Sequence, residues 1–393
     1  MAKVTEFQWQ IPVPELLQKG ADVNIQYGGK TLRTDECRNG NLKNVKVLIK
    51  GGADVNLKHG DFSPLTEACW YGHFDIVQIL IKSGADVNFK GRFATPLTSA
   101  CQKGYMDIVQ KLLKVDADVN LNDEKYTPLI ATCYNGHSQI VEKLIGTGAD
   151  VNGIYGDNTP LTAACYFGHL DIVKKLIEAG ADVNLNDGKF TPLTAACLNG
   201  HLDVVQKLIE AGADVNLKVG NQTPLILASQ NGYLAIAQKL IEAGADVNLD
   251  NGKVTPLIVA CYNDNSQIVE KLIGAGADVN GIDGDDTPRT VTCQHGHSTT
   301  PQKLIEAGAD SKLNERIPRP MIAACLRGHL GVVQKLIGAG ADINGNDGKY
   351  TPLTASCCYG HLDIAQKLIK SGADVNLKVG NQTPLILASQ NGY

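Results

Sequence analysis

The stretch TPLTAACLNGHLDVVQKLIEAGADVN, residues 191–216, decides the fold because it contains two helix signals separated by a turn. Thr191 can cap a helix, and Pro192 suits the first position, where a missing N–H costs nothing. Asn199-Gly200 ends this helix, with glycine as a left-handed cap. The second helix follows His201, and its apolar residues form one stripe: Val204, Val205, Leu208 and Ile209. The stretch therefore predicts a helix, a tight turn and an amphipathic helix.

The same stretch returns along the whole chain at a constant step. Thr191 and Thr223 each begin a TPL triplet, and they lie 32 residues apart. Similar triplets at the same step begin at Ser63, Thr95, Thr127, Thr159, Thr255, Thr287, Arg319, Thr351 and Thr383, with a degenerate copy at Thr31. A constant period of this size indicates a solenoid in which each unit contacts its neighbours. We expect about twelve units in place of several globular domains.

A short hairpin is predicted between successive helix pairs. Asp187-Gly188 is a dipeptide that favours a type I′ turn, with positive φ at both central positions. Glycine recurs in this slot, for example at Gly156, Gly220 and Gly348. Each unit is therefore expected to consist of a hairpin, a helix, a turn, a second helix and a return loop.

The pattern TPL…A…GH…DIV…L…GADVN resembles the ankyrin repeat over nearly the whole chain. The resemblance implies an all-α solenoid of curved helix-turn-helix stacks with short β-hairpin fingers. It implies an N-terminal half repeat and first finger in 1–30, a degenerate first repeat in 31–62 and an array in 63–393 that ends in the middle of a repeat. The family usually has His after TPL, whereas Thr194 and Ile226 stand there in this chain. The sequence therefore leaves undecided whether this chain makes the side-chain hydrogen bonds that this His makes in the family.

Composition and charge exclude several classes. The chain has 393 residues, is 43% hydrophobic and 20% charged, and carries a net charge of −5. These values are ordinary for a globular protein and give no basic field for nucleic acid. The sequence contains neither a signal-peptide core nor 18 uninterrupted apolar residues, so we expect no membrane insertion. We expect a soluble intracellular protein, in the cytoplasm, with the nucleus kept open.

Ten of the eleven cysteines share the period of the repeat. They stand on the predicted first helices at Cys37, Cys69, Cys101, Cys133, Cys165, Cys197, Cys261, Cys293, Cys325 and Cys357, and only Cys358 is out of phase. Stacked helices lie about 8–10 Å apart, whereas a disulfide needs Cα atoms within about 7 Å. We interpret the in-phase cysteines as small, buried, reduced core residues.

The histidines follow the same period and predict no chemistry. Seven of them follow the glycine of the predicted turn: His73, His137, His169, His201, His297, His329 and His361. Motifs of hydrolases, nucleotide-binding loops and zinc proteases are missing from the sequence. We therefore predict no enzyme, no catalytic residue, no metal site and no cofactor.

The resemblance implies three partner-facing slots in each unit, namely the residue before TPL and the two residues before the GH turn. Eleven of the 21 aromatic residues (7 Phe, 2 Trp and 12 Tyr) occupy these slots in eleven units. They are Phe62, Trp70, Tyr71, Tyr126, Tyr134, Tyr166, Phe167, Phe190, Tyr262, Tyr350 and Tyr359. Concentrated aromatic side chains are typical of binding anchors, although such rings also fill gaps between units.

Because most of these rings lie between Phe62 and Phe190, we expect a partner to dock mainly on the N-terminal half of the concave face. The predicted function is a protein-interaction scaffold that binds another protein through this face and the fingers. The alternative is a structural spacer or elastic segment of a longer protein. We expect a monomer whose uncapped last helix, with Leu385 and Ile386, is open to end-to-end contact.

Two further features are singled out by the sequence. Residues 289–321 depart from the repeat, with Arg289 at a buried Leu slot, Pro301 in the second helix and Arg316 in place of the hairpin glycine. We expect a decayed repeat or a hinge there. The resemblance also implies substrates of an asparaginyl hydroxylase, with target residues Asn184, Asn216 and Asn248, although this spacing is that of the repeat itself.

Overall fold

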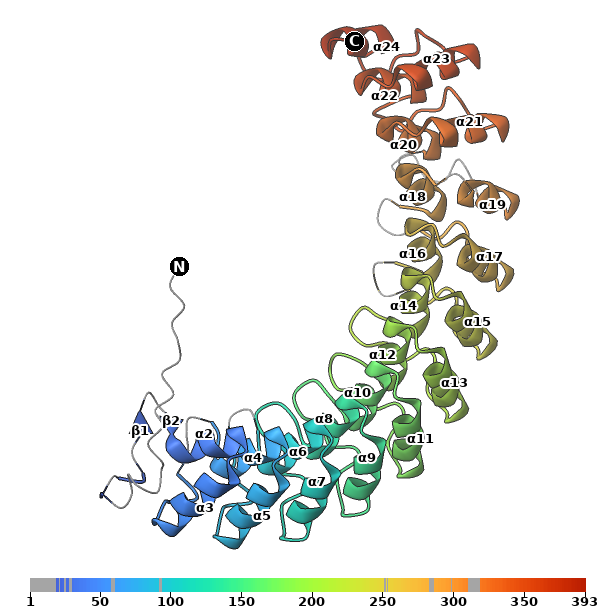
Figure 1. Cartoon of the computed structure of the whole chain (residues 1–393). Helices are drawn as coiled ribbons and strands as arrows, with labels where there is room; N and C mark the ends of the chain where they lie inside the picture. Colours follow the sequence, from blue (N-terminus) through green and yellow to red (C-terminus); the bar gives the residue numbers. More distant parts are fainter. Residues whose placement is uncertain are drawn as a thin grey trace. The chain divides into compact units, whose positions relative to one another are not determined.

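A computed structural model of the chain describes residues 19–20, 22–24, 26–27, 30–57, 61–91, 94–250, 252, 254–282, 286–297, 299–309 and 319–393. The chain divides into two compact units, Met1–Ala195 (unit 1) and Ala196–Tyr393 (unit 2), and each is described by itself. In each unit, short antiparallel helix pairs follow one another in sequence order (Figure 1). The predicted all-α solenoid is confirmed.

The first helices begin at the slot of the repeat that proline occupies in all of them except α2, where Leu32 stands there. They are α2 (Leu32–Asn39), α4 (Pro64–Tyr71), α6 (Pro96–Lys103), α8 (Pro128–Asn135), α10 (Pro160–Phe167), α12 (Pro192–Asn199), α14 (Pro224–Asn231), α16 (Pro256–Tyr262), α18 (Pro288–His295), α20 (Pro320–Arg327), α22 (Pro352–Cys358) and α24 (Pro384–Gln390).

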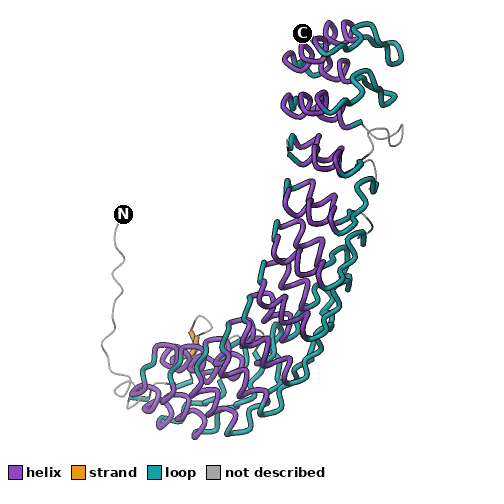
Figure 2. Tube along the Cα trace, turned by 90° about the vertical axis from the view of Figure 1, so that its right-hand side faces the viewer, coloured by secondary structure: helices purple, strands orange, loops and turns teal. Residues whose placement is uncertain are grey.

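The second helices follow the turn at the end of each first helix. They are α3 (Leu42–Lys50), α5 (Phe74–Lys82), α7 (Met106–Leu113), α9 (Ser138–Ile145), α11 (Leu170–Glu178), α13 (Leu202–Glu210), α15 (Leu234–Glu242), α17 (Ser266–Gly274), α19 (Thr300–Glu306), α21 (Leu330–Gly338) and α23 (Leu362–Lys370). Helices and loops alternate regularly along each unit (Figure 2).

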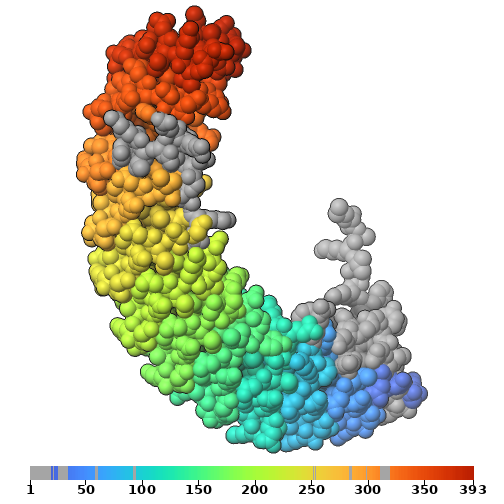
Figure 3. Space-filling view, turned by 180° about the vertical axis from the view of Figure 1, so that it is seen from behind, coloured from blue at the N-terminus to red at the C-terminus, as the bar shows by residue number. Residues whose placement is uncertain are grey.

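Each internal helix of a unit packs against the equivalent helices of the two adjacent repeats and against the other helix of its own pair. In unit 1, α6 contacts α4 and α8, and α7 contacts α5 and α9; in unit 2, α16 contacts α14 and α18. The surface of each unit accordingly changes colour in sequence order, without mixing of remote segments (Figure 3). This arrangement makes the stability of the array a sum of terms from single repeats and from the interfaces between neighbours.

The predicted helix caps are present. Backbone N–H of Thr194 donates to the Thr191 hydroxyl at 3.1 Å, and Gly200 takes the left-handed conformation with φ of 79°. The Thr194 hydroxyl also accepts from the Thr191 N–H at 2.8 Å, which completes a reciprocal cap. Thr98 and Thr162 make the same pair of bonds, so threonine closes the helix start at the slot where the family usually has His.

The hairpins differ from the predicted type I′ turn, because only the glycine takes positive φ. Gly188 has φ of 97°, whereas Asp187 precedes the two central residues and is not left-handed. The Asp187 side chain instead fixes the turn by accepting from the N–H groups of Lys189 and Phe190. At Tyr155–Asn158, Gly156 alone has positive φ in the bridge, the pattern of a type II′ turn.

Regular strand pairing in the described residues is limited to one short hairpin. Strand β1 (Gln26–Tyr27) pairs antiparallel with β2 (Lys30–Thr31), with Gln26 opposite Thr31. This hairpin spans the boundary predicted at residue 30. The other fingers whose residues are fully described are turns with at most an isolated bridge, as at Val219–Gln222 and Val379–Gln382.

The core runs between the two helix layers. In α13, Val204, Val205 and Leu208 are buried as predicted, whereas Ile209 is half-buried. All eleven cysteines are free thiols, and nine of the ten in-phase cysteines are buried. Cys357 departs from the prediction because it is half-buried, like Cys358, on α22, where only α24 packs on the far side.

Candidate functional site

Five of the predicted partner-facing rings form one continuous group in unit 1, which we call the aromatic strip: Tyr126, Tyr134, Phe167, Tyr166 and Phe190. Ring centres are 5.6 Å apart for Tyr126 and Tyr134, and 4.2 Å for Tyr134 and Phe167. The chain continues from Phe167 to Tyr166 at 5.0 Å and from Tyr166 to Phe190 at 6.0 Å. Tilted and edge contacts at these separations are the favourable geometries for aromatic pairs.

Two local devices place these rings side by side. Tyr134, Tyr166 and Phe167 lie in the last turns of α8 and α10, just before the left-handed glycines that end both helices. Tyr126 and Phe190 lie at the bases of two fingers, where an aspartate accepts from the backbone N–H of the ring residue at 2.6 Å in each case. Because each repeat places its slots at the same height, rings from successive repeats of unit 1 come into contact.

The strip has an exposed part and a buried part. Tyr134, Tyr166 and Phe167 are 37%, 37% and 36% exposed, respectively, which leaves apolar surface open to a partner. Tyr126 is only 9% exposed because it lies against Tyr134, so it supports the strip and offers little surface of its own. Burial raises the pKa of Tyr134, and the neighbouring Tyr126 adds to this shift.

A pocket of about 240 Å³ opens on the strip. All five rings line it, together with polar residues that the sequence did not single out as binding residues: Asp157, Asn158, Thr162, Asp187 and Lys189. The pocket therefore combines ring surfaces with two carboxylates and one ammonium group. The sequence predicts Asp187 only as a turn residue. A signal for a role in the pocket is that the same spacing of Asp, Lys and an aromatic residue recurs in another finger, as in Asp123-Glu124-Lys125-Tyr126.

The finger lysines lie over the rings that follow them. The Lys189 ammonium is 5.3 Å from the centre of the Phe190 ring, and the corresponding distances are 5.0 Å for Lys125 and Tyr126 and 5.1 Å for Lys349 and Tyr350. A cation within about 6 Å of a ring centre is attracted by the ring quadrupole. The ring faces at the finger bases therefore already accept a positive charge in the free chain.

The other six predicted rings lie outside the strip. In unit 1, Phe62 and Trp70 are half-buried, with Lys103 at 4.1 Å from the Trp70 ring, and Tyr71 stacks on His73. In unit 2, the rings pair with histidines, Tyr262 with His295 and Tyr359 with His361, while Tyr350 is half-buried.

The histidines and cysteines show structural roles. His73 donates from Nε2 to the Arg38 carbonyl of the preceding repeat at 3.0 Å, and His329 does the same to Gln294 at 2.9 Å. Burial raises the pKa of the Cys101 and Cys325 thiols to about 12, so they stay protonated. Among the residues that the structure describes, no group of three or more His, Cys, Asp or Glu side chains is placed to hold a metal ion.

Two of the three predicted hydroxylation sites, Asn216 and Asn248, belong to a series of hydrogen bonds between repeats that the sequence did not reveal. The Asn216 side chain accepts from the Asp246 N–H at 2.8 Å and donates to the Gly244 carbonyl at 3.4 Å. Asn248 bonds Asp278 and Gly276 of the next repeat in the same way. Hydroxylation of Asn184, Asn216 and Asn248 stays a prediction, and in the folded chain the amides of Asn216 and Asn248 are engaged between repeats.

The irregular repeat keeps its helices. Arg289 is only 5% exposed at its apolar slot, and its guanidinium donates to the Ala309 carbonyl at 3.5 Å. Pro301 lies in the first turn of α19, where it removes no helical hydrogen bond. Arg316 lies outside the described residues.

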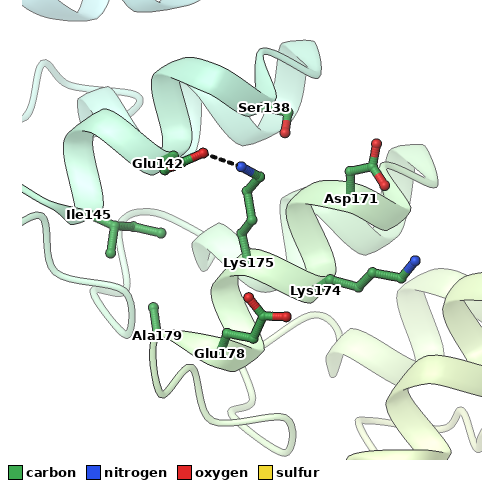
Figure 4. Close-up of a pocket in the computed structure, with 8 residues that line it drawn as sticks. All are labelled: Ser138, Glu142, Ile145, Asp171, Lys174, Lys175, Glu178 and Ala179. Carbon is green, nitrogen blue, oxygen red and sulfur yellow. Dashed lines mark hydrogen bonds and ion pairs between the residues drawn. The ribbon is translucent and has the colours of Figure 1, made fainter.

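A larger but more open hollow of about 720 Å³ lies between α9 and α11. Its lining is mostly charged, and Lys175 reaches from α11 to pair with Glu142 on α9 (Figure 4). It contains none of the predicted rings. Because exposed ion pairs contribute little binding energy, the aromatic pocket is the stronger candidate for a site.

No described helix has both the length and the apolar content needed to cross a bilayer. The search of curated proteins found no match. Among solved structures, the ankyrin repeat domain of human ASB11 is 30% identical with a TM-score of 0.51, and the match covers 55% of this chain and 99% of that chain.

A family model described as ankyrin repeats (3 copies) matches seven overlapping or adjacent segments of the sequence. They are residues 12–91, 92–155, 153–219, 186–251, 217–283, 257–347 and 320–393. Ankyrin repeats generally mediate protein–protein interaction and are typically non-enzymatic scaffolds. With its paired helices, its finger turns and this match over nearly its whole length, the chain belongs to the ankyrin repeat family.

Proposed function

We propose that the chain is a non-catalytic scaffold that binds another protein through the aromatic strip of unit 1. The observation that supports this most directly is the unbroken series of ring contacts from Tyr126 to Phe190, of which three rings are more than one-third exposed. Aromatic anchors that cluster around a pocket carry most of the binding energy in many protein interfaces. The same proposal places the chain in a reducing compartment such as the cytoplasm, which its buried free thiols support.

A photo-crosslinking experiment on the intact chain tests the proposal. Tyr166 and Tyr262 occupy the same slot in two repeats, but only Tyr166 belongs to the strip. A photoreactive phenylalanine analogue replaces one or the other in cells, and adducts are identified by mass spectrometry. We expect a protein adduct at position 166 and none at position 262, which is the more exposed of the two at 55%.

Binding of the purified partner is then measured for the wild-type chain and for a triple variant, Tyr134→Ala, Tyr166→Ala and Phe167→Ala. Anchors of this type cost about 2 kcal/mol or more each when truncated, so the triple variant should lose measurable binding. Tyr126 is left in place because its burial makes it part of the packing. Equal adduct formation at both positions, or unchanged binding by a folded triple variant, contradicts the proposal and leaves a structural spacer as the better description.

A further inference from the structure

One carboxylate in the aromatic pocket has an unused, buried acceptor. Asp187 is 7% exposed, and its Oδ1 atom accepts from the N–H groups of Lys189 at 2.8 Å and Phe190 at 2.6 Å. Its other oxygen, Oδ2, is buried and accepts no hydrogen bond. A buried carboxylate oxygen without a donor is unfavourable, so a ligand that brings a donor gains the full benefit of that bond.

The corresponding aspartates of two other fingers differ at this point. Asp123 makes the same two turn bonds, but neither of its carboxylate oxygens is both buried and without a partner. Asp347 makes the turn bonds as well, but it is half-exposed and open to water. Of these three aspartates, only Asp187 combines burial, a missing donor and a place in the lining of the aromatic pocket.

The surroundings of Asp187 suit a flat organic cation. Tyr166 and Phe190 present rings to the pocket, and the exposed Asp157 adds a second carboxylate to its lining. The Lys189 ammonium already lies over the Phe190 ring, but Lys189 is exposed on a finger and can move away. In the free chain this lysine therefore occupies the position that an incoming cation would take.

We propose that this pocket receives the side chain of an arginine from an extended segment of the partner protein, with the guanidinium on the Tyr166 and Phe190 rings and its N–H groups toward Asp187 Oδ2 and Asp157. The inference rests on the proposed function and specifies the chemistry of the partner. A guanidinium is planar, stacks on aromatic faces and donates five hydrogen bonds in a fixed fork. A lysine ammonium is a strongly hydrated point charge that uses the ring faces and the two carboxylates less completely.

Peptide titration on the intact chain tests the inference. The probe is acetyl-Gly-Ser-Arg-Ser-Gly-amide with a fluorescent label, and its matched controls carry citrulline, which has nearly the same shape without the charge, or lysine. We expect the citrulline peptide to bind about tenfold more weakly, and the lysine peptide to fall between the two. Equal binding of the arginine and citrulline peptides, or tightest binding of the lysine peptide, overturns the inference.

Variants of the chain assign the binding to this pocket. Asp187→Asn keeps an oxygen for the turn bonds but removes the charge, and we expect about tenfold weaker binding of the arginine peptide. Lys189→Gln removes the internal competitor and should tighten binding about threefold. The matched control is Asp347→Asn, which makes the same change in the same turn of unit 2 and should leave binding unchanged.

A second variant keeps the test valid if Asp187→Asn unfolds the finger. Phe190→Leu keeps an apolar side chain but removes the ring face, and it should weaken the arginine peptide severalfold without a change for the citrulline peptide. Equal effects of Asp187→Asn and Asp347→Asn contradict the inference. If position 166 forms adducts with a partner whose binding is unaffected by Asp187→Asn, the inference is wrong and the proposed function stands. If the arginine peptide binds but no protein adduct forms, the proposed function is wrong and the pocket still binds arginine.

Discussion

The side-chain oxygen of Asn120 accepts a hydrogen bond of 2.9 Å from the backbone N–H of Asp150, which lies in the following repeat. The Asn120 amide also donates to the Gly148 carbonyl at 3.2 Å, and its own N–H donates to Asp118 at 2.9 Å. One asparagine therefore ties two backbone groups of the next repeat to its own loop. The same arrangement recurs at Asn88 and Asn152 in unit 1, and at Asn248 in unit 2 the side chain makes the same two bonds.

We expect Asn120→Ala to lower the free energy of unfolding by about 1 kcal/mol, because two hydrogen bonds between repeats are lost at a solvent-exposed site. Chemical denaturation followed by circular dichroism measures the change. Asn122→Ala is the matched control, since the Asn122 side chain accepts only from the exposed Lys90 ammonium. Similar losses of unfolding free energy for both variants would contradict a stabilising role of the asparagine hydrogen bonds between repeats.

The rings of the strip should differ in their effect on stability. Tyr126→Ala removes a side chain that is 9% exposed and should cost about 3 kcal/mol of unfolding free energy. Tyr166→Ala removes one that is 37% exposed and should cost less than about 1 kcal/mol. Equal losses in urea titrations would mean that Tyr166 mainly packs between repeats and does not serve as an exposed binding surface.

The burial of the in-phase cysteines predicts slow thiol labelling and loss of stability at alkaline pH. Burial raises the pKa of Cys101, Cys293 and Cys325 from 9.0 to about 12. The folded chain therefore keeps protons that the unfolded chain releases above pH 9, so unfolding becomes easier as the pH rises from about 9 toward 12. Native labelling should modify Cys357 and Cys358 first, because both are half-buried.

Replacement of these three cysteines by alanine should flatten the decline in stability between pH 9 and pH 11, as measured by the thermal midpoint. Serine is less suitable because its hydroxyl needs a hydrogen-bond partner at a buried site. An unchanged pH profile in the alanine variant would assign the alkaline unfolding to other groups. Rapid native labelling of the nine buried thiols would contradict their burial.

The repeat that contains Arg289 should be the weakest internal part of the array. Arg289 is 5% exposed at a slot where Leu257 and Leu353 are 1% and 2% exposed, so a charged group replaces a buried apolar one. Hydrogen exchange should be fastest in α18 and α19 among internal helices, and Arg289→Leu should slow it and raise the unfolding free energy by about 1 kcal/mol or more. Uniform exchange from α4 to α22 would contradict this prediction.

Local signals in the sequence were enough for much of the fold. Thr191 and Pro192 specify a helix start and Gly200 a helix end, because cap and turn preferences act within a few residues. The apolar stripe at Val204, Val205 and Leu208 and the period of the cysteines specify which faces are buried. The type I′ turn was wrong because Asp187 uses its side chain to fix the turn, an option that dipeptide preference does not include.

The candidate site depended on contacts between repeats. The sequence placed aromatic residues in equivalent slots, but only packing decided that five of them touch in series and that Tyr126 is buried in contact with Tyr134. Packing also decided that the Asn120 side chain bonds the next repeat. Asp123 and Asp187 stand in the same slot, yet of the two only Asp187 has a buried oxygen without a donor. The sequence by itself determined the repeating unit, whose signals are local, whereas the tertiary structure decided the site, whose partners come from the neighbouring repeat and differ between copies of the same slot.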